Sequence, residues 1–133
     1  MIYALDSNIV SYMVKKDNDV QMAFQNAIND DHFYAIPPLV FYEVKRWLTI
    51  KKASVQLKEF TELYNNGIKN DMTSEIWEKA IDLYVYLRTA GKFVEDADIF
   101  IAAYCIVNDY VLVTNNIKHF DAINDLETIN WKV

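Results

Sequence analysis

The chain has 133 residues and a formal net charge of -6, with 53% hydrophobic and 24% charged residues. This length suits one core and is too short for two independent ones, so we expect a single domain over residues 1–133. The longest apolar stretch, from Ile99 to Val107, is far shorter than a membrane span, and the excess of acids argues against a protein that coats nucleic acid through bulk charge.

The N-terminal segment reads as a short strand followed by polar residues that favour a helix start. It has no basic region ahead of its apolar residues and no small-residue cleavage site, so we expect no signal peptide and a cytoplasmic location. Ile2 to Leu5 form an apolar run, and Asp6, Ser7 and Asn8 all favour N-cap positions. The pattern therefore predicts a strand-to-helix junction, with Asp6 at the carboxyl end of the strand.

The next segments alternate between helical and extended patterns. Val20 to Asn29 carries apolar residues at helical spacing, and Phe33 to Ile36 is a predicted short strand that Pro37-Pro38 ends. Because proline suits the first turn of a helix, Leu39 to Ile50 is predicted to be helical immediately afterwards. Glu43 then lies in the middle of that helix.

A helix, a short strand and a second, well-capped helix are predicted next. Ser54 to Tyr64 keeps the helical pattern until Asn65-Asn66-Gly67 stops it, and Ile68 to Met72 is a predicted third strand. Thr73 and Ser74 then cap a helix that runs through Ala90.

An apolar helix and two short strands complete the chain. Glu95-Asp96-Ala97-Asp98 leads into IFIAAYCIV, which is apolar on all sides, so we expect a centrally buried helix with Asp98 in its first turn. The lone cysteine, Cys105, lies in this segment and is expected to pack in the core, since one thiol forms no internal disulfide. Tyr110 to Val113 and Glu127 to Trp131 are predicted strands, the latter at an edge.

Four polar residues are predicted to converge on one rim of this arrangement. Alternating strands and helices indicate an α/β fold with a parallel sheet, and such sheets bind ligands beyond the carboxyl ends of their strands. Asp6, Glu43, Asp98 and Asn116 would meet there, and oxygen ligands of this kind suit Mg²⁺ and Mn²⁺, which promote phosphodiester hydrolysis. Each acid alone has an ordinary alternative, because acids at helix starts are common caps and a mid-helix glutamate is commonly exposed.

Four short motifs occur in an order that resembles a PIN-domain ribonuclease, and more closely the VapC toxins of bacterial VapBC toxin–antitoxin pairs. The motifs are LDSN at 5–8, Glu43 within VFYEV, DADIFIAA at 96–103, and LVTNN followed by HF at 112–120. The resemblance runs nearly end to end. It implies a three-layer α/β/α fold in which a short parallel sheet of about four to five strands has helices on both faces.

The resemblance also assigns roles to individual residues. Asp6, Glu43 and Asp98 match the family's catalytic, metal-binding acids. The supporting positions are Ser7 and Asn8 beside the first acid, Asp96 as an auxiliary acid, and Thr114 beside the pocket. Asn116 stands where many PIN domains have a fourth acid, which places affinity for a second metal in question. Asp121 is expected either to make a water-mediated contact or to be an ordinary loop acid.

The activity implied by the resemblance is that of a Mg²⁺-dependent endoribonuclease, with Mn²⁺ able to substitute. Such a toxin hydrolyses RNA, with tRNA such as initiator tRNA as the suggested substrate, and thereby inhibits translation. The implied partners are a VapB-like antitoxin and a second copy of the chain, with no membrane. The alternatives are an inert PIN-like scaffold that binds RNA or protein and, ranked lower, a phosphate-transfer module, for which only Asp71 offers the required acid.

The histidines and most aromatic residues are not predicted to take part in the chemistry. His32 and His119 are far apart in the sequence and match no ligand spacing, and metal-assisted hydrolysis requires no histidine base. Surface or capping roles are expected for both histidines.

Overall fold

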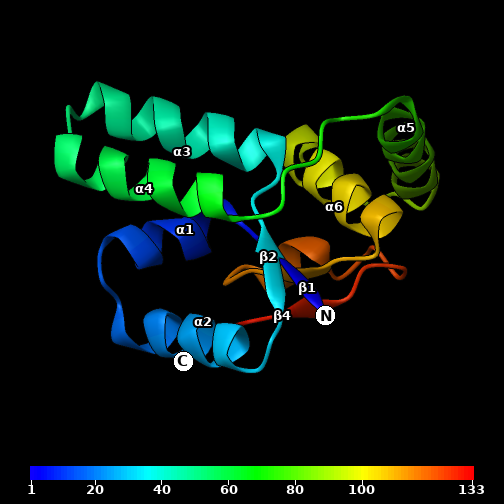
Figure 1. Ribbon diagram of the computed structural model, residues 1–133. Coiled ribbons are helices and arrows are strands. Elements are labelled where there is room, and N and C mark those ends of the chain that lie inside the picture. Colours follow the sequence, from blue (N-terminus) through cyan, green and yellow to red (C-terminus); the bar gives the residue numbers. More distant parts are fainter.

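Four short parallel strands lie between helices in the computed structural model, which describes residues 1–133 (Figure 1). In chain order the elements are β1 (Ile2–Leu5), α1 (Ser7–Val14), α2 (Asn18–Asn29), β2 (Phe33–Ala35), α3 (Pro38–Ile50), α4 (Ser54–Asn66), α5 (Ser74–Thr89), α6 (Asp96–Asn108), β3 (Val111–Val113), the short 3₁₀ helix η1 (Ile117–Phe120) and β4 (Thr128–Ile129). None of the helices has the length and hydropathy needed to span a bilayer.

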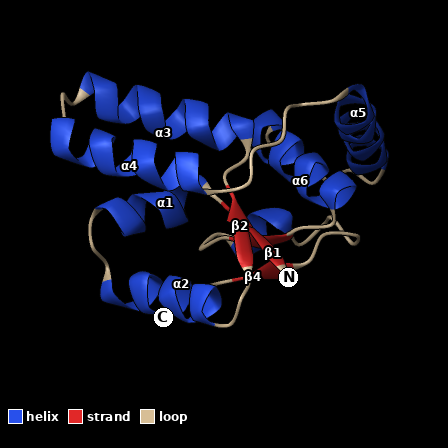
Figure 2. Cartoon of the chain, in the orientation of Figure 1, coloured by secondary structure: helices blue, strands red, loops and turns tan.

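The sheet has the strand order β2-β1-β3-β4, so β1 and β3 are its central strands. Tyr3 pairs with Tyr34 on one side and with Val111 on the other, and Leu112 pairs with Thr128. Figure 2 shows this small sheet flanked by helices, with α1 and α2 on one side, α5 and α6 on the other, and the antiparallel α3–α4 pair beyond the tip of β2. The predicted three-layer α/β/α fold is confirmed.

Side chains at the helix starts explain where several helices begin. Asp6, Asp17 and Thr73 occupy the N-cap positions of α1, α2 and α5, and each accepts a hydrogen bond from a backbone N–H of the first turn. Pro37 and Pro38 open α3, where a missing N–H costs nothing. The predicted caps are therefore confirmed at β1–α1 and at α5.

The core contains 29 buried residues and is centred on α6 and the two central strands. The predicted burial of α6 is confirmed, since its apolar residues are buried on several faces; the buried set is Ile99, Ile101, Ala102, Ala103, Tyr104 and Cys105. Burial raises the pKa of the Cys105 thiol, so that residue packs as a small neutral group.

The predicted third strand at Ile68 to Met72 is wrong, because only Ile68 pairs with the sheet, through an isolated bridge to Ala35. The chain then leaves the sheet, and the side chain of Asn70 points towards α6 and β3. Its Oδ1 accepts hydrogen bonds from the hydroxyls of Tyr104, at 3.0 Å, and Tyr110, at 2.8 Å. These two hydrogen bonds hold Asn70 against Tyr104 and Tyr110, and no residue after Ile68 in this segment pairs with β2. The predicted edge strand is confirmed as β4 but is reduced to two residues.

Several helices end in a left-handed backbone conformation without using glycine. Lys16, Asp31, Lys52 and Asp109 have φ angles of 64°, 61°, 54° and 59°. Of the two glycines, only Gly91, after α5, has a positive φ. Side-chain-bearing residues thus make turns that glycine makes more easily.

Candidate active site

Asp6 lies at the carboxyl end of β1, where the central strand leaves the sheet and α1 begins. Its side chain is 6% exposed. Oδ1 accepts a hydrogen bond from the Ser7 N–H at 2.8 Å, while Oδ2 accepts one from Thr114 Oγ1 at 2.7 Å and one from Asn8 Nδ2 at 3.2 Å. A buried carboxylate that accepts hydrogen bonds from three donors has a fixed orientation.

Polar side chains join the ends of β1 and β3 around Asp6. Thr114, which is fully buried, directly follows β3, and its hydroxyl also accepts a hydrogen bond from the Asn116 N–H at 3.0 Å. Asn8 Oδ1 accepts one from the Asn115 N–H at 2.9 Å. Segments separated by more than a hundred residues are thereby held together at the carboxyl edge of the sheet. The predicted supporting positions Asn8 and Thr114 therefore contact Asp6.

Glu43 is brought to the same edge by α3, as the sequence predicts. The Ser7 hydroxyl donates a hydrogen bond to Glu43 Oε1 at 2.8 Å, so Ser7 touches Asp6 through its backbone and Glu43 through its side chain. Glu43 is half-buried and directly precedes Val44, one of the three buried residues of α3 with Val40 and Leu48. The ordinary alternative of a fully exposed helical glutamate does not apply.

Asp98 lies in the first turn of α6, and its environment disfavours the ionised form. Burial, followed by the charge of Asp6, raises the pKa of Asp98 above its usual range. The charges of Glu95 and Glu43 act in the same direction, whereas His119 opposes them. The predicted acids at 6, 43 and 98 therefore share one electrostatic environment although they come from three different elements.

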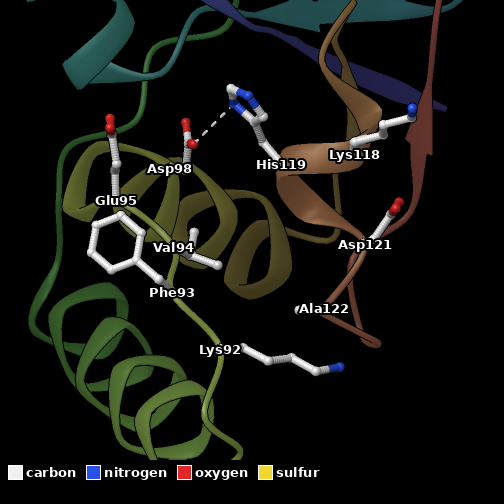
Figure 3. A pocket seen from close by; sticks show the side chains of 9 residues that line it. All are labelled: Lys92, Phe93, Val94, Glu95, Asp98, Lys118, His119, Asp121 and Ala122. Carbon is white, nitrogen blue, oxygen red and sulfur yellow. Dashed lines mark ion pairs between the residues drawn. The ribbon is translucent and has the colours of Figure 1, made fainter.

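His119 also belongs to this site, which the sequence analysis missed. Its Nδ1 lies 3.4 Å from Asp98 Oδ2, and the two side chains point towards each other in Figure 3. The side chain is 59% exposed, so the expected surface position is confirmed, and its contact with Asp98 places it beside the site. No local pattern connects the start of α6 with η1.

An open pocket of about 520 Å³ extends from Asp98 between the loop after α5 and the segment around η1 (Figure 3). It is lined by Lys92, Phe93, Val94, Glu95, Asp98, Lys118, His119, Asp121 and Ala122. Asp121 thus faces the same pocket as Asp98. Asn116 is exposed and its side chain makes no hydrogen bond, although its backbone N–H supports Thr114.

The neighbouring acid of Asp98 is Glu95 and not the predicted Asp96. Asp96 and Asp98 are two residues apart on the helix and do not face each other, whereas Glu95 is the N-cap of α6 and Asp98 is its third helical residue, two positions that are adjacent at a helix start. Asp96 accordingly lines an apolar groove between α5 and α6 with Trp77 and Phe100, while Glu95 borders the pocket of Asp98. The relation between an N-cap and the third helical residue would have indicated Glu95.

The donor set of this site fits a hard divalent cation. No three histidine, cysteine, aspartate or glutamate side chains lie close enough to form a ready-made cage. However, no lysine or arginine pairs with Asp6, Glu43 or Asp98. Carboxylate oxygens that no lysine or arginine neutralises suit Mg²⁺, which keeps several waters and takes only a few protein carboxylates.

Comparisons with known proteins agree with this geometry. A family model described as PIN domain matches residues 3–126. Ribonuclease VapC2 of Rickettsia felis is 27% identical over 132 residues, covering 98% of each chain. Two solved structures have the same fold over almost the whole chain.

The first is the complex VapBC2 from Rickettsia felis bound to a DNA fragment from its promoter, with a TM-score of 0.87 and 25% identity over 99% of this chain and 100% of that chain. The second, VapBC-1 from nontypeable Haemophilus influenzae, has a TM-score of 0.86 and 20% identity over 100% of both chains. The family match spans almost the entire sequence and includes all three acids, so the chain belongs to the PIN-domain family.

Proposed function

We propose that this chain is a Mg²⁺-dependent endoribonuclease and the toxin of a type II toxin–antitoxin pair, with the whole of residues 1–133 as one PIN domain. The observation that carries the proposal is that Asp6, Glu43 and Asp98, from three elements, share one electrostatic environment without a lysine or arginine partner. The similarity to a protein named Ribonuclease VapC2 supports RNA as the substrate.

The uncompensated charge is the chemical reason to expect a cation. Burial and the charges of neighbouring carboxylates raise the pKa of Asp98, and a bound cation would offset the cost of keeping these acids ionised together. A bound Mg²⁺, or Mn²⁺ in its place, would supply positive charge for the phosphate and activation of a water. Asp6, Glu43 and Asp98 would hold it.

The remaining polar residues orient these acids. Ser7 connects Asp6 to Glu43 through its backbone N–H and its hydroxyl, while Thr114 and Asn8 fix the second oxygen of Asp6. His119 restrains Asp98 from the opposite wall of the pocket. Preorganised ligands of this kind lose little free energy to rearrangement when substrate arrives.

The substrate class and partners follow the same proposal. Hydrolysis of RNA, with tRNA and especially initiator tRNA as the first substrate to test, would inhibit translation in the cytoplasm. The expected partners are a VapB-like antitoxin that covers the acidic pocket and a second copy of the chain. Solved structures of similar proteins that are described as VapBC complexes support an antitoxin partner.

The direct test is incubation of the purified chain with total RNA, with Mg²⁺ or with excess EDTA, followed by mapping of the new RNA ends. We expect cleavage only with the cation, and its loss in Asp6→Asn and Asp98→Asn. Asp71→Asn is the matched control, because Asp71 is an exposed acid outside the pocket. Cleavage in EDTA, or full activity of either pocket variant, would refute the nuclease.

A second measurement separates an inert scaffold from an enzyme. Calorimetric titration with Mn²⁺ should give specific binding to the unaltered chain and none to Asp98→Asn. Absence of specific binding to both would favour a scaffold without catalysis. Copurification with a small protein encoded beside this chain would support the antitoxin, whereas a lone, non-toxic, monomeric product would contradict both partner expectations.

A further inference from the structure

The pocket beside Asp98 is larger than the proposed chemistry needs. Of the three acids only Asp98 lines it, and its volume of about 520 Å³ falls within the range of pockets that hold small organic ligands. Its walls are the loop Lys92 to Glu95 and the segment from Lys118 to Ala122. Figure 3 shows that these two walls come from opposite sides of α6.

Phe93 is the most unusual side chain of this pocket. It is 80% exposed and makes no aromatic contact within the chain. Core packing therefore does not explain a phenylalanine at this position. An exposed aromatic ring beside a nuclease site has a ready use, because unpaired RNA bases stack on such rings.

Two lysines of the pocket are also available to contact phosphate groups. Lys92 and Lys118 each line it, and neither forms an ion pair with an acid of this chain. In a chain of net charge -6, two unpaired lysines near one acidic pocket are suited to contact the phosphates on either side of a bound base.

The polar groups of the walls indicate which bases would fit. The side chains of Glu95 and Asp121 border the pocket and take part in no hydrogen bond or ion pair of the chain. Ionised carboxylates only accept hydrogen bonds. They pair with an amino group such as cytosine N4 and are repelled by a carbonyl oxygen at the same position.

We propose that this pocket binds one unpaired base of the RNA, stacked on Phe93, and that Glu95 and Asp121 select a base with an exocyclic amino group over uracil. This inference rests on the proposed ribonuclease function, to which it adds a substrate preference. The selected nucleotide lies next to the bond that is cleaved, because the pocket opens onto Asp98.

The test compares binding of two matched single-stranded probes, fluorescently labelled octacytidylate and octauridylate, by anisotropy in EDTA, so that no metal-dependent cleavage consumes them. We expect octacytidylate to bind more tightly than octauridylate. Phe93→Ala should weaken binding of octacytidylate by about 5- to 100-fold, the range that loss of one stacked base gives, and Phe93→Trp should retain it. Tyr86→Ala is the matched control, since Tyr86 is a 51% exposed aromatic outside this pocket.

The double variant Glu95→Gln with Asp121→Asn tests the selection separately. Amides offer donors as well as acceptors, so the preference for octacytidylate should fall towards unity while Phe93 still supports stacking. Equal affinity of the unaltered chain for the two probes would overturn the selection. No binding of either probe, or an unchanged affinity in Phe93→Ala, would overturn the base site.

The RNA cleavage assay distinguishes this failure from failure of the nuclease. Cleavage of total RNA that is unaffected by Phe93→Ala would overturn the base site and leave the ribonuclease intact. Octacytidylate binding that depends on Phe93, in a chain that cleaves no RNA, would support the base site and refute the ribonuclease.

Discussion

Replacement of Thr114 by valine tests the hydrogen bonds that hold Asp6. Thr114 is fully buried, so counting apolar surface alone predicts that valine is tolerated better than serine. The structure predicts the reverse, because Thr114 Oγ1 donates to Asp6 Oδ2 at 2.7 Å. A hydrogen bond to a charged group contributes about 1.5–3 kcal/mol, and valine removes it while leaving the carboxylate buried.

We expect Thr114→Val to lower the free energy of unfolding by about 2–3 kcal/mol, and Thr114→Ser, which keeps the hydroxyl, by about 1 kcal/mol. Urea denaturation measures both, and for a slope of about 1.5 kcal/mol per molar the valine midpoint falls by about 1.3–2 M. RNA cleavage should fall by about 10- to 100-fold in the valine variant alone, since Asp6 loses its orientation. A valine variant as stable as the serine variant would refute the reasoning.

Three further predictions concern the metal and the buried tyrosines. Mn²⁺ at about 100 times its dissociation constant should stabilise the unaltered chain by about 2.7 kcal/mol, which raises Tm by roughly 10 °C. The Asp98→Asn variant should show no such rise. Equal Tm shifts for the two proteins in scanning calorimetry would contradict the assignment of Asp98 as a metal ligand. Asn70→Ala leaves the hydroxyls of Tyr104 and Tyr110 without their acceptor and should lower the free energy of unfolding by about 2–4 kcal/mol, measured by urea denaturation. A decrease below about 0.5 kcal/mol, as surface substitutions give, would argue against the shared hydrogen bonds. Burial raises the pKa of Tyr34 from 10.0 to about 12, so its contribution to stability is complete below pH 10 and is lost as the pH rises through 12. Alkaline unfolding followed by circular dichroism should show this loss, and a Tyr34→Phe variant with an identical pH dependence would exclude Tyr34 as its source.

The sequence predicted those parts of the fold that depend on local rules. The strand-to-helix junction at Asp6 and the cap at Thr73 follow from residue preferences that act within a few positions. The burial of α6 followed from an apolar surface that no solvent-exposed helix tolerates. The failed strand after Gly67 shows the limit of this approach, because the partner of Asn70 is a pair of tyrosines more than 30 residues away.

The candidate site was predicted unevenly for the same reason. Asp6 and Asp98 lie at element ends, which chain topology brings to one edge of a parallel sheet. Glu43 required the family resemblance, since nothing local indicates that Ser7 donates a hydrogen bond to it. His119 depends on the distance between η1 and α6, which no motif encodes. Glu95 could have been predicted, because an N-cap residue lies beside the third residue of its helix, which here is Asp98.

The left-handed helix ends described above bear on how this protein can change over evolutionary time. Lys16, Lys52 and Asp109 hold φ angles that cost roughly 1 kcal/mol or more each relative to glycine. These positions lie outside the acidic pocket, so substitutions there could add stability without altering the chemistry. The stability gained at these positions would offset the loss caused by a destabilising substitution in the pocket. Residues such as Phe93 and Glu95, and with them the base preference, could then change under selection without unfolding the protein.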